Sequence, residues 1–402
     1  MRRRSVLAST IGLAAAAGLG ISGASAQTRP LKIGVLTDMG GPFSSMTGPG
    51  VVEAARMAVE DFGGEVAGRK IEILVADHQN KADVGTAIVR QWFDVDGVDA
   101  VADIVGSAIA LATSEIAKEK KKILLYSGAG SSDLTGRACM PYGFHWTWDS
   151  YALAVGTATA IVGSGKKSWF FLTQDYAMGH ATERDATQRL AKLGGSVVGS
   201  AAAPLNTVDY SSFILQAQAS RAEVLALATT AGTVPALKQA HEFGLDRSGM
   251  LIAPLQLTLT ETHAVGLEVA QGVRTVAAFY WGQSPDSVAW SRKFYARRGA
   301  MPSDMQAGVY SAVRHYLQAI KDTGSVDPDV VANKMRATKI NDMFAKDGWI
   351  RKDGRVIHDM YLVEAKKPSE STEPWDYFRV LSKLSGEDVF RPLAEGGCSL
   401  VQ

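Results

Sequence analysis

The chain has 402 residues, of which 46% are hydrophobic and 21% are charged, a composition typical of a globular protein and not of a disordered one. The formal net charge is only +1, so nothing in the composition argues for nucleic-acid binding. The length accommodates two domains of about 100–200 residues each.

The first 26 residues have the features of a secretory signal peptide. Three arginines precede an apolar stretch, and Ala24-Ser25-Ala26 gives a small-residue cleavage site before Gln27. The run at 3–7 also resembles a twin-arginine signal, so Sec and twin-arginine export both remain open. The apolar stretch contains Gly and Ser and is too short for a stable transmembrane anchor. We therefore predict an exported protein without membrane insertion.

Short apolar runs then alternate with amphipathic helical patterns. The first predicted strands are 31–37, 70–77, 99–105 and 122–128. The pattern restarts after 145–156, with predicted strands at 169–175, 196–204, 223–230, 250–256 and 275–281. This β-α-β-α order indicates parallel sheets with helices on both faces. We predict two α/β units of similar design.

The last part of the chain has a different pattern. The segments 287–299 and 306–324 read as helices, and Asp353-Gly354 between alternating runs predicts a hairpin. Cys139 and Cys398 are predicted to form a disulfide because the protein is exported, with two buried free thiols as the alternative. No low-complexity linker separates the units, so we expect the chain to cross between them more than once.

Two neighbouring predicted strands end in Gly and Ser. Gly106-Ser107 follows the strand at 99–105, and Ser127 to Gly130 follow the next one. Ligands bind outside the carboxyl ends of strands in open parallel sheets, and helix N-termini there favour anions. A helix cap and a glycine turn would explain each segment alone. The repetition of the same chemistry at adjacent strand ends is the reason to consider a ligand site.

Aromatic side chains gather where the two units meet. The run FHWTWDSY occupies 144–151, and Tyr280 lies in FYW at the end of the predicted strand 275–281. Tyr176 follows another strand end, in TQDYAMGH. Rings at such junctions line ligand clefts in many proteins, and packing beneath a hinge is the alternative.

The sequence contains no recognisable catalytic motif. The seven His show no H-E-x-x-H or Cys-His spacing, and no G-x-S-x-G, dinucleotide fingerprint or P-loop occurs. Asp77-His78 is the best acid–base candidate, although an Asp that caps the next turn is the simpler interpretation. We predict a non-enzymatic protein with no cofactor and no metal.

These segments, in this order, resemble the type I periplasmic solute-binding proteins of ABC transporters, specifically the leucine/isoleucine/valine-binding family. The resemblance starts at LKIGVLTDMGGPFSSMTGPGVVEAARMAVED and continues through GSAIA, SGAGSSDLTG, FFLTQDYAMGH and AGVYSAV. It implies an α/β fold of two Rossmann-like lobes, joined by three crossover strands, that close on a ligand. The implied lobes are 27–148 with 282–357, and 149–281 with 358–402.

The resemblance also implies ligand-binding residues. In the family, strand ends matching Val105–Ser107 and Gly128–Gly130 hold the carboxylate of the ligand, and Ser107 matches the hydroxyl donor. Asp149 aligns with one of two acids that hold an ammonium, whereas the second aligns near Gln256, which is not an acid. Because a partly compensated ammonium is costly to bury, an amine-free oxo or aromatic acid is favoured. The full candidate set is Phe43, Met46, Val105, Gly106, Ser107, Gly128, Ala129, Gly130, Asp149, Tyr176, Thr230, Gln256 and Tyr280.

We therefore expect a monomeric periplasmic protein that delivers a small organic carboxylate to an ABC permease and its ATPase. A periplasmic sensor that presents the solute to a receptor or kinase is the alternative. An exported enzyme is a third class.

Overall fold

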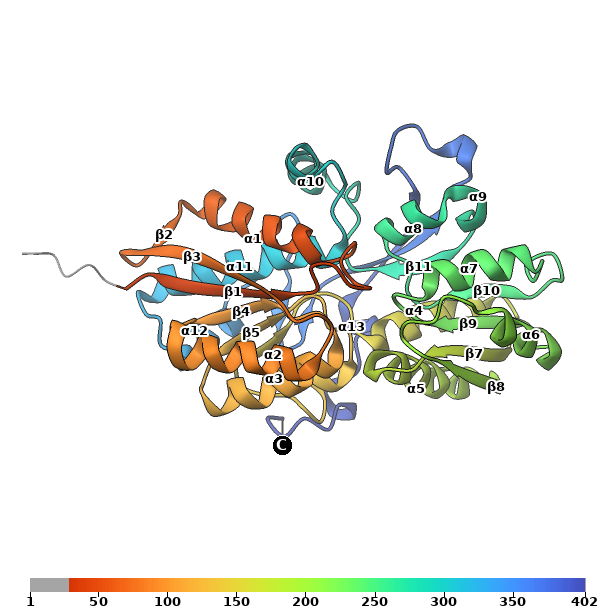
Figure 1. Cartoon of the computed structure of the whole chain (residues 1–402), viewed down its shortest axis with the longest axis horizontal. Coiled ribbons are helices and arrows are strands. Elements are labelled where there is room, and N and C mark those ends of the chain that lie inside the picture. The colour runs from red at the N-terminus through yellow and green to blue at the C-terminus, as the bar shows by residue number, and fades with distance from the viewer. Residues whose placement is uncertain (1–28, 402) are drawn as a thin grey trace, which may run out of the picture.

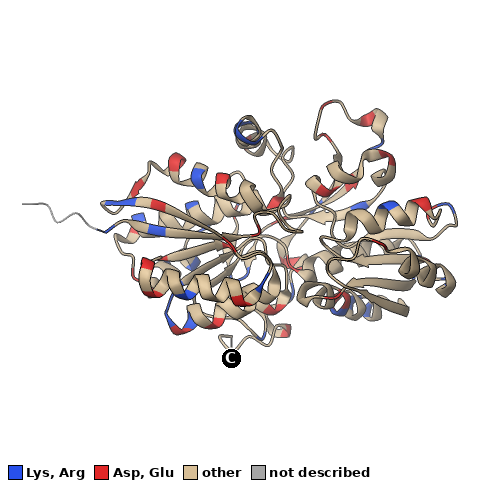
Figure 2. Ribbon diagram, viewed as in Figure 1, with Lys and Arg blue, Asp and Glu red and all other residues tan. Residues whose placement is uncertain are grey.

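The computed structural model describes residues 29–401, and the predicted signal peptide lies outside the described residues. Two α/β lobes lie end to end along the long axis of the molecule (Figure 1). Within residues 29–401, no helix combines the length and apolar character that crossing a bilayer requires. Basic and acidic residues are mixed along the helices of both lobes (Figure 2).

The first lobe is built on a six-stranded sheet with the order β2-β3-β1-β4-β5-β6. All pairs are parallel except β2 with β3. The strands are β1 (Leu31–Thr37), β2 (Glu65–Val66), β3 (Arg69–Asp77), β4 (Ala100–Asp103), β5 (Ile123–Tyr126) and β6 (Gly143–His145). Six helices pack against this lobe: α1 (Gly48–Phe62), α2 (Ala82–Gln91), α3 (Ser107–Glu119), α10 (Pro285–Arg298), α11 (Asp304–Thr323) and α12 (Pro328–Ala337).

The second lobe has a four-stranded parallel sheet with the order β10-β9-β7-β8. Its strands are β7 (Ser168–Gln174), β8 (Ser196–Ala203), β9 (Val224–Ala228) and β10 (Leu251–Pro254). Its helices are α4 (Ser150–Gly163), α5 (Ala177–Lys192), α6 (Ser211–Ser220), α7 (Thr233–Glu242), α8 (Leu259–Val265) and α9 (Leu267–Ala270). An antiparallel sheet of β11 (Arg274–Ala277), β14 (Met360–Ala365) and β15 (Phe378–Leu384) packs beside α4.

Up to the end of β15, the chain passes between the lobes three times, after β6, after β11 and before β14. The predicted architecture of two Rossmann-like lobes with three crossings is therefore confirmed, whereas the residue boundaries of the lobes remain a prediction. The hairpin predicted around Asp353-Gly354 is present as β12 (Trp349–Ile350) and β13 (Val356–Ile357).

Local sequence explains why the central elements form. Six of the seven residues of β1 are buried, as expected for a strand that pairs on both sides inside a parallel sheet. Helix α11 begins with a capping box between Ser303 and Gln306 and ends at Gly324 in the left-handed conformation. The predicted strand 275–281 is too long, because β11 ends at Ala277. Tyr280 consequently lies beyond the strand.

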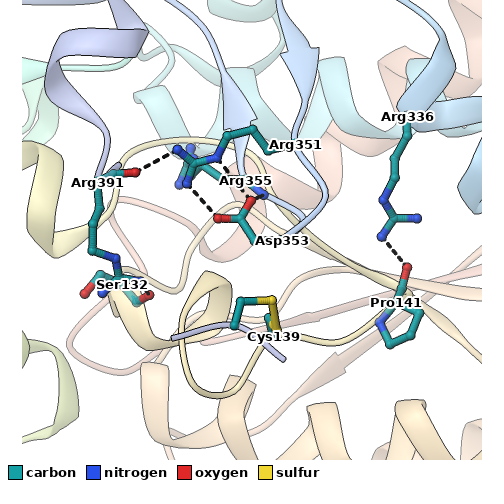
Figure 3. The surroundings of a disulfide bond; sticks show 9 residues. Ser132, Cys139, Pro141, Arg336, Arg351, Asp353, Arg355 and Arg391 are labelled. Carbon is teal, nitrogen blue, oxygen red and sulfur yellow. Dashed lines mark hydrogen bonds and ion pairs between the residues drawn. A yellow bond between two sulfur atoms is a disulfide. The ribbon is translucent and has the colours of Figure 1, made fainter. Parts of the chain in front are cut away.

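The disulfide between Cys139 and Cys398 is present, with a Cα–Cα distance of 5.6 Å. Arg391 holds the same tail by donating to the carbonyl of Ser132 at 2.7 Å, and Arg351 donates to the carbonyl of Arg391 at 2.7 Å (Figure 3). The tail, which includes the short helix α13 (Gly386–Val389), is therefore tied back to the segment that follows β5.

Candidate functional site

The loop after β1 carries Phe43 to the junction of the two lobes. The carboxylate of Asp38 accepts hydrogen bonds from the backbone N–H of Gly41 at 2.8 Å and of Phe43 at 3.0 Å. This turn places the Phe43 ring 6.1 Å from the ring of Tyr176 in the second lobe, centroid to centroid. Met46 is buried in the same loop, and its carbonyl accepts a hydrogen bond from Ser303 at 2.6 Å.

Ser107 joins the ends of β4 and β5. It is the first residue of α3, directly after Gly106, whose φ of 90° is unfavourable for other residues. Its Oγ accepts hydrogen bonds from the backbone N–H of Gly130 at 3.3 Å and of Ser131 at 3.1 Å. Within residues 29–401 this hydroxyl donates to no acceptor, so its proton is available for a carboxylate at the helix N-terminus.

The two glycines of the second strand end lie where side chains do not fit. A Cβ at Gly128 would lie 2.6 Å from Oδ1 of Asp103 and 2.8 Å from Cβ of Val105. A Cβ at Gly130 would collide with the ring of Trp148 and lie 2.5 Å from Sδ of Met178. Because Met178 belongs to α5, Gly130 is a point of close approach between the lobes.

Ala129 lies between these glycines, and its carbonyl is already paired. Nε2 of His145 lies 2.7 Å from this oxygen. Burial and the neighbouring Arg355 lower the pKa of His145 well below its ordinary value, so the neutral ring donates this bond. The carbonyl of Ala129 therefore already accepts one hydrogen bond, from His145.

Tyr176, Thr230 and Gln256 form a chain of hydrogen bonds in the second lobe. The Tyr176 hydroxyl bonds to Oγ1 of Thr230, which bonds in turn to Oε1 of Gln256 at 3.3 Å. Oγ1 of Thr230 also lies 3.7 Å from Sδ of Met178. Gln256 is 3% exposed, and its Nε2 has no hydrogen-bond partner among the described residues. The N–H group of Gln256 therefore remains without a hydrogen-bond acceptor at the end of this series of bonds.

Two buried acids that the sequence analysis did not select lie at the same junction. Glu261 in α8 accepts bonds at Oε2 from the backbone N–H and the hydroxyl of Thr258, both at 2.7 Å. Its Oε1 has no partner within residues 29–401. Burial raises the pKa of Glu261 to about 8, and the negative charge of Asp304 acts in the same direction. Burial also raises the pKa of Asp304 to about 6, against a hydrogen bond that its carboxylate accepts from the backbone N–H of Met305 at 3.1 Å.

Both oxygens of Asp149 are occupied by protein partners. Oδ1 caps α4 by accepting from the N–H of Ala152 at 2.8 Å, and Oδ2 lies 3.5 Å from Nη1 of the fully buried Arg355. Arg355 also donates to the carbonyl of Thr147. The structure therefore gives Asp149 a capping and charge-pairing position at the hinge.

Tyr280 does not lie with Tyr176, Thr230 and Gln256 at the lobe junction. Its hydroxyl lies 3.5 Å from Oδ1 of Asp376, and its ring packs against Trp281 and Phe378. These residues lie at the end of the antiparallel sheet, so the ring packs beneath the crossover.

The lobes are in contact in this structure. In addition to the contacts of Phe43 and Gly130 with the second lobe, the hydroxyl of Ser132 donates to Oδ2 of Asp185 at 2.8 Å. The predicted residues that meet at the junction are Phe43, Ser107, Gly130, Tyr176, Thr230 and Gln256. A serine hydroxyl and a helix N-terminus on one side, with buried polar groups on the other, suit a small anion with a second polar group.

Comparisons with known proteins give a consistent result. A sequence profile described as "Periplasmic binding protein" matches residues 30–371. The Leu/Ile/Val-binding protein homolog 6 of Brucella melitensis is 25% identical over 376 residues, which cover 90% of this chain and 94% of the homolog. A solved periplasmic binding protein from Burkholderia mallei is 45% identical, with a TM-score of 0.90 over 92% of this chain and 99% of its own. A branched chain amino acid ABC transporter periplasmic ligand-binding protein from Burkholderia xenovorans is 36% identical, with a TM-score of 0.84 over 92% of this chain and 100% of its own.

Proposed function

The chain belongs to the periplasmic binding protein family, and on that premise we propose that it delivers a small organic carboxylate to an ABC permease and its ATPase. In this proposal it is exported through the signal at 1–26, by the Sec or the twin-arginine route, and works as a monomer without catalysing a reaction. The name of the Burkholderia xenovorans relative, which refers to an ABC transporter, supports the transport role.

The observation that supports a carboxylate as the ligand is the position of Ser107. Its hydroxyl lies at the N-terminus of α3 and has already organised the backbone of Gly130 and Ser131 through two accepted hydrogen bonds. An oxyanion placed there receives the hydroxyl proton and the favourable end of the helix dipole. The lobe that closes over it contributes Tyr176 and Met178.

The same site supports a ligand without an amine. An ammonium buried between the lobes would need acidic partners. Asp149 already caps α4 and pairs with Arg355, and burial raises the pKa of the two other acids at the junction, Glu261 and Asp304, which favours their neutral forms. We therefore propose an oxo acid or an aromatic acid as the ligand class.

A thermal-shift screen of the purified protein tests this function. The panel holds amino acids, aliphatic oxo acids, aromatic acids, amides and urea, and each hit is confirmed by calorimetry. We expect the hits to be amine-free carboxylates. Binding of leucine or valine at micromolar affinity, with failure of oxo and aromatic acids, would contradict the ligand class and leave the binding role intact. Loss of uptake of the same compound in a deletion strain would distinguish a transporter component from a sensor.

A further inference from the structure

Two consecutive charged residues of the second lobe receive one hydroxyl group of the first lobe. Ser132, which follows β5, is fully buried, and its hydroxyl donates to Oδ2 of Asp185 at 2.8 Å. The same hydroxyl oxygen accepts a hydrogen bond from Nη2 of Arg184 at 3.0 Å. Arg184 and Asp185 lie in α5, which follows β7. The Ser132 side chain is therefore both donor and acceptor to neighbouring residues of the opposite lobe.

The carboxylate of Asp185 is buried, and both of its oxygens are paired. Oδ2 also accepts a hydrogen bond from the hydroxyl of Ser150 at 2.7 Å, and Oδ1 accepts one from Nε of Arg184 at 3.0 Å. Nη1 of Arg184 lies 3.5 Å from Oδ1 of Asp133 in the first lobe. Hydrogen bonds to a charged group are stronger than neutral ones, so removal of the Ser132 hydroxyl takes away a strong contact. The four side chains that meet between the lobes are named the α5 clasp: Ser132, Asp133, Arg184 and Asp185.

The α5 clasp adjoins the proposed carboxylate site. The backbone N–H of Ser131 donates to Oγ of Ser107 at 3.1 Å, and the next residue along the chain is Ser132 of the clasp. Arg391 donates to the carbonyl of Ser132 at 2.7 Å and so holds this turn from the side of the C-terminal tail. The clasp is therefore anchored to the strand end that would hold the carboxylate.

Helix α5 meets the first lobe at two separate places. Met178, in its first turn, lies against Gly130, because a Cβ at Gly130 would lie 2.5 Å from Sδ of Met178. Asp185 comes seven residues later, on the same face of the helix and about 10 Å further along its axis. A hinge rotation separates at least one of two such contacts unless its axis runs through both. The contacts along α5 therefore depend on closure of the lobes.

We propose that Arg184 and Asp185 are positioning residues for closure, which hold α5 against the first lobe and set the affinity for every bound solute by a common factor. They act through Ser132 and Asp133 and not through the solute. A contact that exists only in the closed state shifts the equilibrium between open and closed forms by its own free energy. This inference rests on the proposed function in one respect, the binding of a solute between the lobes.

The test is a double-mutant cycle between Ser132→Ala and Asp185→Ala, measured by calorimetry with 4-methyl-2-oxopentanoate, phenylpyruvate, benzoate and leucine. We expect each single variant to bind every compound that wild type binds about tenfold more weakly, and the double variant to be no weaker than the weaker single variant. Additive losses would show that the bond is the same in the open and closed forms and would overturn the inference. Losses that differ between compounds would also overturn it, because they indicate contact with the solute.

A control and a milder variant accompany the cycle. Arg189→Gln changes an arginine of the same helix whose Nε donates to Thr159 of α4 at 3.1 Å, within the second lobe, so affinity should not change. Arg184→Gln removes a partly exposed side chain and should weaken binding by about threefold. Stopped-flow kinetics should place the loss in the dissociation rate, since the clasp forms after the solute has entered. A variant that is merely misfolded would instead show a lower binding stoichiometry, and such a result for Ser132→Ala would contradict the proposed role.

Small-angle X-ray scattering of the unliganded proteins gives the second readout. If unliganded wild type is mainly open, weakening of the clasp appears as lower affinity. If it is mainly closed, affinity changes little and Ser132→Ala should instead have a larger radius of gyration. Unchanged affinity together with an unchanged radius of gyration would overturn the inference. If none of the four compounds binds wild type, the proposed function fails for them, and scattering alone then decides the inference, which an unchanged radius would overturn.

Discussion

The ring of Phe43 in the first lobe lies 6.1 Å from the ring of Tyr176 in the second, with the two planes inclined by 36°. This contact, together with the approach of Met178 to Gly130, places the two lobes against each other over the ends of β4 and β5. Closure in this family of folds is a hinge motion, so contacts between the lobes control the stability of the closed state.

Gly130→Ala should weaken closure, and it should also disturb the packing of Trp148 beneath the site. The added methyl group would meet Trp148 and lie 2.5 Å from Sδ of Met178. Overpacking of this kind costs about 1–3 kcal/mol, which corresponds to a loss of about fivefold to 150-fold in ligand affinity. Calorimetry and small-angle X-ray scattering would measure affinity and closure. The control is Gly40→Ala in the neighbouring loop, where nothing lies within 4 Å of the added Cβ, and equal affinities for the two variants would contradict the prediction.

Asp149→Ala should lower the free energy of unfolding by about 3–5 kcal/mol, because it leaves the buried guanidinium of Arg355 without its anionic partner. Asp149→Asn keeps an oxygen acceptor for the cap of α4 and should cost less. Urea unfolding measures both. Asp327→Ala removes an exposed cap from α12 and should cost only about 1 kcal/mol. A similar cost for Asp149→Ala and Asp327→Ala would show that the Arg355 pair contributes nothing.

The stability of Asp103→Asn relative to wild type should increase as the pH rises. Burial raises the pKa of Asp103 to about 7, and the charge of Asp38 adds to the rise. The folded wild type then binds a proton that the unfolded chain releases at about pH 4, so its stability declines between pH 4 and pH 7. Asn has no such proton and tolerates the positive φ of 72° at this position.

The measurement for Asp103→Asn is the difference in unfolding free energy between variant and wild type. This difference should grow in favour of the variant from pH 5 to pH 8. Burial lowers the pKa of His78 and His358, and these groups stabilise the fold as the pH rises, so the wild-type profile alone would mix opposite contributions. A difference that does not change with pH would contradict the prediction.

Replacement of both Cys139 and Cys398 by Ser should lower stability and leave ligand affinity nearly unchanged. The bridge closes a loop with a sequence separation of 259 residues, which contributes about 5 kcal/mol at most in the chain-entropy model. Arg391 and Arg351 still hold the tail, so we expect it to stay in place (Figure 3). Urea unfolding of the variant and of the reduced wild type should agree, and an unfolding free energy equal to that of the oxidised wild type would contradict the prediction.

The sequence predicted the parts of the site that depend on strand order. Ser107 and Gly130 could be paired from the sequence because parallel strands bring their carboxyl ends to one edge of a sheet. The partner of Asp149 could not be predicted, since Arg355 lies 206 residues away in a hairpin with no local link to it. Tyr280 was assigned to the cleft because the predicted strand was too long, whereas β11 ends three residues earlier.

The position of Glu261 at the lobe junction could not be predicted from the sequence. The spacing Thr258-x-x-Glu261 is a capping box, and this pattern alone indicates the start of a helix. The unpaired Oε1 and the approach of Asp304 depend on how the second lobe meets α11, so only the folded structure reveals them.

The most direct test of the account is the affinity of Ser107→Ala for the tightest carboxylate that the thermal-shift screen finds. A ligand at 100 times its Kd should add about 2.7 kcal/mol to wild-type stability, so the screen readily detects such a compound. Ser107→Ala should then bind it more weakly by about 1–3 kcal/mol, whereas Ser284→Ala, which removes a comparable capping hydroxyl from α10, should bind it as wild type does. Because the Ser107 hydroxyl also supports Gly130 and Ser131, the melting temperature of each unliganded variant is measured alongside. An unchanged Kd for Ser107→Ala would remove the carboxylate from this strand end and contradict the central claim.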